Sequence, residues 1–190
     1  MAKEQPQAYR ATARRFHWWT VGLLAVQVPL GIAMVVRGSG FGIWDGLTNA
    51  SYSTHKLLGV VLFVLVAARL AYRLSNGVPD GEPTIEAWQH RTSRATHWAM
   101  YGLLLTVPLL GWFGVQLYPA LGLFGLVELP AVVAPDKAAS AVVLQAHAAA
   151  AFGLMALVAL HVGAALFHRF VRHDRVFQRM QPGGPASGPA

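Results

Sequence analysis

An uncharged stretch, Ala138–Phe167, sets the strongest limit on how this chain can fold. Its 30 residues include no Asp, Glu, Lys or Arg. A helix of about 20 mainly apolar residues is long enough to cross the hydrocarbon core of a bilayer. The stretch is therefore predicted to form a helix that spans a membrane.

Two histidines, His147 and His161, lie inside this stretch. They are 14 residues apart, which is close to four helical turns and about 21 Å along the axis. Both side chains should therefore leave the same face at different depths. An imidazole in hydrocarbon needs partners for its polar nitrogens. For either histidine alone a hydrogen-bonded packing role is an open alternative, but two on one face indicate a bound ligand, and haem iron at each level is the obvious candidate.

The composition assigns the whole chain to the membrane proteins. Of its 190 residues, 55% are apolar and 12% are charged, too few charges for the surface of a soluble domain of this length. The absence of Cys excludes disulfides, thiolate ligation of haem and cysteine-held iron–sulfur clusters. The net charge of +7 could suit nucleic acid, but the bases flank apolar runs and form no nucleic-acid-binding motif. Membrane lipid, not nucleic acid, is the expected partner.

The apolar residues fall into four runs, which predict an all-α membrane protein with a bundle of four transmembrane helices. The spans are expected at about 15–36, 55–74, 95–118 and 140–170, in a single domain over residues 1–180. Residues 181–190 are rich in Gly and Pro and are expected to be a disordered tail. The basic N-terminus could instead begin a signal peptide, but the first run is 20 residues long and no clean cleavage site follows, which favours a retained span.

Two connecting segments carry further expectations. Arg37–Thr54 is rich in Gly, Ser and Asn and is expected to be a loop whose Phe41 and Trp44 dip into the membrane interface. Leu121–Val133 is apolar, but its 13 residues are too few to cross a bilayer. An interfacial or re-entrant segment is expected there.

The basic residues predict the orientation of the spans. Only Arg37, Lys56 and Lys137 belong to one side of the membrane. The twelve on the other side are Lys3, Arg10, Arg14, Arg15, Arg69, Arg73, Arg91, Arg94, Arg169, Arg172, Arg175 and Arg179. Because cytoplasmic segments carry the excess of Lys and Arg, both termini should be cytoplasmic.

This topology sorts four histidines into two pairs. His17 begins the first span and His161 lies near the end of the fourth, both toward the cytoplasmic side. His55 begins the second span and His147 lies early in the fourth, both toward the periplasmic side. We therefore predict two haem b groups about 20 Å apart, each with two axial histidines. Such iron has no open coordination position and is suited to moving single electrons.

His97 and His168 are expected at the cytoplasmic surface, and either could compete as the ligand on that side. His161 lies deeper, so we assign these two to contacts with haem propionates or a quinone headgroup, with ordinary interfacial polar residues as the alternative. Arg69, Arg73 and Arg169 could neutralise propionates, although anchoring at the cytoplasmic surface also explains them.

Glycines in the spans could let helices or a flat macrocycle approach closely. Gly59 and Gly153 lie near the proposed periplasmic ligands, and Gly31, Gly111 and Gly163 lie elsewhere in the spans.

Taken together, several motifs resemble one family. They are RFHWW in the first span, THKLLG and ARLAYRL in the second, THWAMYGLLLTVPLLGW in the third, and QAHAAAAFGLMALVALHVGAALFHRFVRHD followed by RMQP in the fourth. From about Arg14 to Pro182 the chain resembles the bacterial di-haem cytochrome b561 family, inner-membrane proteins related to the cytochrome b subunits of hydrogenases and formate dehydrogenases. By this resemblance His17, His55, His147 and His161 match axial ligand positions. His97 also matches a family histidine.

The resemblance implies electron exchange with ubiquinone in the bacterial inner membrane, and for some members oxidation of superoxide at the periplasmic face. Lys56 and Lys137 could attract that anion. The alternative within redox chemistry is an anchor and electron-relay subunit bound to a larger dehydrogenase or hydrogenase as partner protein. A histidine-lined metal-ion transporter is a third hypothesis, but it would need intramembrane carboxylates, and the four predicted spans contain none.

Overall fold

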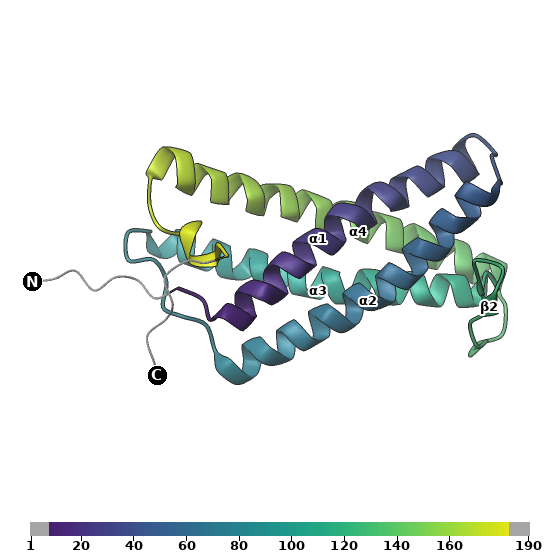
Figure 1. Cartoon of the computed structure of the whole chain (residues 1–190), viewed down its shortest axis with the longest axis horizontal. Helices are drawn as coiled ribbons and strands as arrows, with labels where there is room; N and C mark the ends of the chain where they lie inside the picture. Colours follow the sequence, from purple (N-terminus) through teal and green to yellow (C-terminus); the bar gives the residue numbers. More distant parts are fainter. Residues whose placement is uncertain (1–7, 183–190) are drawn as a thin grey trace, which may run out of the picture.

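The computed structural model describes residues 8–182 and, over them, contains four long helices. They are α1 (Ala11–Val35), α2 (Gly46–Asn76), α3 (Ala87–Leu117) and α4 (Lys137–Phe167). Consecutive helices run in opposite directions along one bundle (Figure 1). A π-helical turn extends α1 (η1, Val36–Gly40), another extends α4 (η2, His168–Arg172), and a short 3₁₀ turn follows (η3, Gln178–Met180). Each long helix is apolar enough to cross a membrane, which confirms the predicted four-helix membrane fold.

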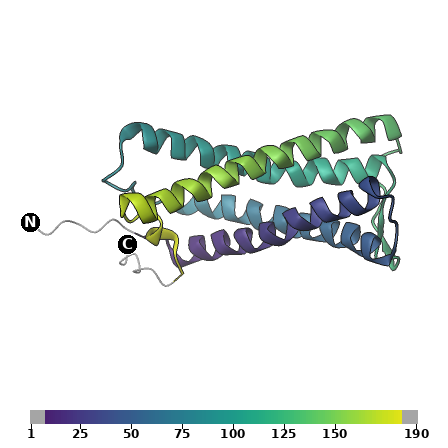
Figure 2. The same ribbon diagram turned by 90° about the horizontal axis from the view of Figure 1, so that it is seen from above.

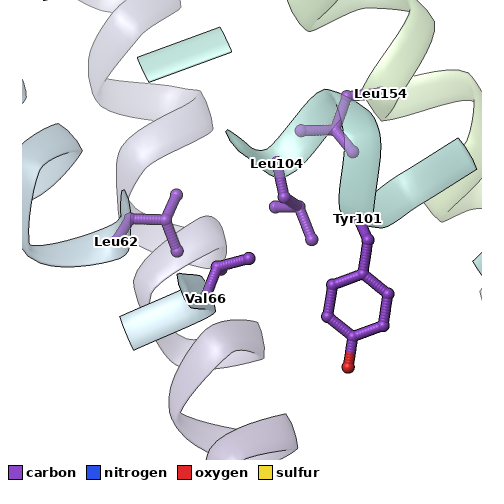
Figure 3. Packing of buried hydrophobic residues seen from close by; sticks show 5 residues of the cluster. All are labelled: Leu62, Val66, Tyr101, Leu104 and Leu154. Carbon is purple, nitrogen blue, oxygen red and sulfur yellow. The ribbon is translucent and has the colours of Figure 1, made fainter. Parts of the chain in front are cut away.

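The helices pack as two antiparallel pairs, α1 with α2 and α3 with α4, and α2 joins the pairs by packing on α3 (Figure 2). The buried apolar cluster is small. Figure 3 shows its five members, Leu62, Val66, Tyr101, Leu104 and Leu154, which come from α2, α3 and α4. Leu154 lies midway in sequence between His147 and His161. Many other large apolar side chains face outward, as expected where lipid is the solvent.

One end of the bundle, here called the terminal end, holds both described chain ends and the α2–α3 connection (Figure 1). The backbone N–H of Tyr9 donates to the Arg179 carbonyl at 3.2 Å. The Trp18 indole N–H donates to the Met180 carbonyl at 2.8 Å. These bonds join the start of α1 to η3. Most of the predicted tail, residues 183–190, lies outside the described residues.

The opposite end, here called the hairpin end, carries a small antiparallel sheet of β1 (Gly122–Leu123) and β2 (Val127–Glu128). The Lys56 ammonium fixes the hairpin to α2 by donating to the carbonyls of Ala120 at 2.9 Å and Gly122 at 2.5 Å. Leu121–Val133, expected to be interfacial or re-entrant, therefore forms a hairpin at the end of the bundle and does not re-enter it. Its place at the membrane interface stays a prediction. Its glycines allow a tight hairpin, and Gly125 takes a positive φ of 70°.

The predicted loop Arg37–Thr54 is largely wrong, because α2 begins at Gly46. Asp45 caps this helix by accepting a hydrogen bond from the Thr48 N–H at 2.9 Å, and it pairs with Arg37 at 2.7 Å. The backbone N–H and then the hydroxyl of Thr48, together with the Arg37 guanidinium, lower the pKa of Asp45 to about 2. Polar residues that indicated a loop are satisfied within the helix: the Ser53 hydroxyl donates to the Asn49 carbonyl at 3.0 Å.

Candidate histidine sites

The structure brings His55 of α2 and His147 of α4 together near the hairpin end. Their ring centres are 6.3 Å apart and their planes are nearly perpendicular, at 84°. Both side chains are half-buried. Residues 92 positions apart in sequence thus form one facing pair, as the predicted depths required.

His147 is held in one orientation by α3. Its Nδ1 lies 2.8 Å from the Val107 carbonyl oxygen, so Nδ1 carries the proton and donates, and Nε2 is left as the basic nitrogen. Gly111 makes room for the ring, because a Cβ at this position would lie 3.1 Å from both Cε1 and Nδ1 of His147. A hydrogen bond from the far nitrogen of this kind orients metal-binding histidines and raises their basicity.

His55 is placed by α1. A Cβ on Gly31 would come within 2.9 Å of the His55 Cε1 atom, so the absence of a side chain at Gly31 creates the recess for this ring. The Gln27 amide donates to the His55 backbone carbonyl at 2.9 Å. The Nδ1 atom of His55 and the Oε1 atom of Gln27 are both buried, and neither has a hydrogen-bond partner. Sequence reasoning missed Gln27, although an amide inside an uncharged span is a signal that could have identified it.

A second facing pair, His17 of α1 and His161 of α4, lies toward the terminal end. Its ring centres are also 6.3 Å apart, with planes at 69°. His97 of α3 is also close to this pair, with its ring centre 5.2 Å from that of His161. Its Nδ1 is 3.4 Å from the Ser93 hydroxyl. All three of these histidines are half-buried.

Two arginines of α2 flank this second pair. The Arg69 Nη2 atom lies 3.3 Å from His17 Nδ1, and its guanidinium is 5.5 Å from the Tyr101 ring centre. One turn further along α2, the Arg73 guanidinium is 5.6 Å from the Trp98 ring centre. The terminal-end pair is therefore beside positive charge, whereas His147 at the other level faces a backbone carbonyl.

His168 begins η2, two turns beyond His161. Its Nδ1 lies 2.5 Å from the Asp174 carboxylate, which Arg172 approaches to 3.9 Å. Asp174 is 9% exposed, so this histidine is fixed to a carboxylate at the terminal end.

The structure distinguishes the five glycines named from the sequence by what faces each of them. Gly59 lies beside Gln27 and Gly153 beside Leu103, and a Cβ on Gly163 would meet no atom within 4 Å. None of these three positions holds a histidine ring. That role belongs to Gly31 and Gly111, because helix crossing, which sequence separation does not show, decides which glycine faces a partner side chain.

Comparison with known proteins decides the family. Residues 8–183 match the family model of the prokaryotic cytochrome b561. The chain belongs to the prokaryotic cytochrome b561 family. As a member of this family, the protein is a multi-pass bacterial membrane protein of the cytochrome b type that takes part in electron transfer, with haem b as its cofactor. The resemblance seen in the sequence motifs is confirmed.

Three relatives extend over nearly the whole chain. Cytochrome b561 homolog 1 of Escherichia coli is 29% identical over 172 residues, which cover 87% of this chain and 92% of the relative. Cytochrome b561 homolog 2 of the same organism is 25% identical over 176 residues, which cover 92% of each chain. Cytochrome b562 of Cereibacter sphaeroides is 25% identical over 179 residues, which cover 93% of this chain and 96% of the relative.

Proposed function

We propose that this protein carries electrons across the bacterial inner membrane through two haem b groups. His17 and His161 would bind one iron, and His55 and His147 would bind the other. Electrons would be exchanged with ubiquinone at the terminal end. The proposal joins the electron-transfer role of the family to the geometry of the four histidines.

The equal spacing of the two pairs carries this proposal. An imidazole nitrogen binds a metal at about 2.0–2.1 Å and lies about one bond length from its ring centre, so two rings on opposite sides of one iron have centres about 6 Å apart. The separation is 6.3 Å in both pairs. The shorter 5.2 Å separation of His97 and His161 fits this arrangement less well, so His97 is proposed to contact a propionate or the quinone.

The surroundings of the hairpin-end pair also fit a bound group. The hydrogen bond from His147 Nδ1 to the Val107 carbonyl leaves Nε2 free to bind iron. The recesses at Gly31 and Gly111 hold the rings of His55 and His147 at the required separation. When bound between two histidines, haem supplies reversible one-electron redox chemistry without an open coordination position.

The proposed orientation places the terminal end in the cytoplasm. Both described chain ends lie there, and of the fourteen basic residues in the described range 8–182, eleven belong to the segments at or near it. The hairpin end would then be periplasmic. Superoxide oxidation at that face would have to rely on Lys137, which is exposed, because the Lys56 ammonium is engaged by the Ala120 and Gly122 carbonyls.

The His168–Asp174 pair is the proposed contact for a quinone headgroup. Asp174 engages Nδ1 of His168, which orients the ring and leaves Nε2 for a ligand. His168 would donate a hydrogen bond to a quinone carbonyl and supply a proton as the quinone is reduced. Asp174 and Arg172 would hold the ring in position.

Reoxidation by quinone tests this assignment. His168→Ala should slow the reoxidation of dithionite-reduced protein by a water-soluble ubiquinone analogue at least tenfold, because it removes the proposed donor, while haem content stays unchanged. Stopped-flow absorbance of the haem band measures the rate. His90→Ala, another histidine at the terminal end, is the matched control and should keep the native rate. Native reoxidation in His168→Ala would contradict the quinone contact.

A further inference from the structure

The two histidine pairs differ in the groups that face their outer nitrogens. At the hairpin end, His147 Nδ1 faces the Val107 carbonyl at 2.8 Å. At the terminal end, His17 Nδ1 faces the Arg69 guanidinium at 3.3 Å. A carbonyl partner strengthens an imidazole as an electron donor to iron, which favours oxidised iron. A nearby positive charge opposes the extra positive charge of oxidised iron and has the reverse effect.

The charge of Arg69 has no carboxylate to compensate it. Within the described range 8–182, the carboxylates that form ion pairs are Asp45 and Asp174, and neither of them pairs with Arg69. Arg69 instead contacts His17 and the face of Tyr101, and it is half-buried. Simple anchoring at the membrane surface would leave such a side chain extended toward water and lipid headgroups. Arg69 is directed into the bundle toward the histidine pair.

We propose that Arg69 raises the reduction potential of the haem between His17 and His161 above that of the haem between His55 and His147. The inference rests on the proposed function. The charge of Arg69 would thus set the order of the two reduction potentials, so that electrons move from the haem at the hairpin end toward the haem at the terminal end. Each transfer oxidises one iron and reduces the other by the same single electron, so no proton or co-reactant is needed for this step.

Proteins with a single site allow the effect of Arg69 to be measured on each haem separately. His147→Ala keeps only the terminal-end pair, and His161→Ala keeps only the hairpin-end pair. Adding Arg69→Gln to the His147→Ala protein should lower the midpoint potential of its remaining haem in a spectroelectrochemical titration. The shift should favour the oxidised form about tenfold, which is about 59 mV for one electron. Adding Arg69→Gln to the His161→Ala protein should leave the midpoint potential of its remaining haem unchanged.

Two further variants separate charge from structure. Arg69→Lys keeps the positive charge and should retain most of the native potential. Arg91→Gln removes an exposed arginine of α3 at the same end and should leave both potentials unchanged, because solvent screens such a charge. An unchanged terminal-end potential in Arg69→Gln, or an equal loss in Arg69→Lys, would overturn the inference.

The order of the two potentials provides a test that needs no change at Arg69. The protein with only the terminal-end pair should titrate at a higher potential than the protein with only the hairpin-end pair. An equal or reversed order would overturn the inference even if Arg69→Gln fails to fold. Native protein without haem would instead overturn the proposed function, so the two failures are distinguishable.

Discussion

Replacing His147 with alanine is expected to halve the haem content of the purified protein, from two groups per chain to one. The substitution removes one proposed axial ligand at the hairpin end, and the opposing His55 alone would leave the iron without its second imidazole. The terminal-end pair lies about 21 Å further along α4, by the rise of a helix, and should keep its haem. A pyridine haemochrome assay on protein of known concentration measures the loss.

His97→Ala is the informative comparison for this prediction. His97 lies 5.2 Å from His161 but belongs to neither proposed pair, so this variant should retain two low-spin haems even though a proposed propionate or quinone contact is lost. Two haems in His147→Ala, or the loss of one in His97→Ala, would show that the ligands are paired differently.

Gly111→Val should remove the hairpin-end haem without any change to a histidine. A Cβ at Gly111 would already lie 3.1 Å from the His147 ring, and the branched valine side chain adds two methyl groups in the same recess. His147 would have to leave this recess and lose its hydrogen bond to the Val107 carbonyl. Haem content should fall to one per chain, with the remaining spectrum that of the terminal-end site.

Gly102→Val is the matched control on the same helix. A Cβ at Gly102 would meet no atom within 4 Å, so valine there changes helix propensity by the same amount but occupies open space. This variant should keep two haems. If Gly111→Val also binds two haems at native levels, the recess does not position the ligand as described.

Much of this fold could be predicted because membrane spans leave a strong signal. Long uncharged runs give the number of helices, and the 14-residue spacing of His147 and His161 gives two depths by helix rise alone. The depth argument also selected the partners that face them in the structure, His55 and His17. Their role as iron ligands is a proposal that the haem assays above test.

The parts that could not be predicted depend on local polar contacts and helix crossing. Ser53 and its neighbours suggested a loop, because composition does not show that their hydroxyls bond back within the helix. The sequence does not distinguish Gly31 and Gly111, which make room for histidine rings, from Gly59 and Gly153, because the side chain that faces each glycine comes from another helix. Likewise, the sequence is consistent with Arg69 as an anchor at the membrane surface, whereas the structure places its guanidinium next to His17.

Haem stoichiometry, measured together with a reduced-minus-oxidised visible spectrum of the purified native protein, tests the central claim most directly. We expect two b-type haems per chain with sharp low-spin bands, because two histidines on each iron leave no open position. Protein that contains no haem when purified from haem-replete cells, or a high-spin spectrum from iron with an open position, would contradict the claim that the four histidines hold two haems.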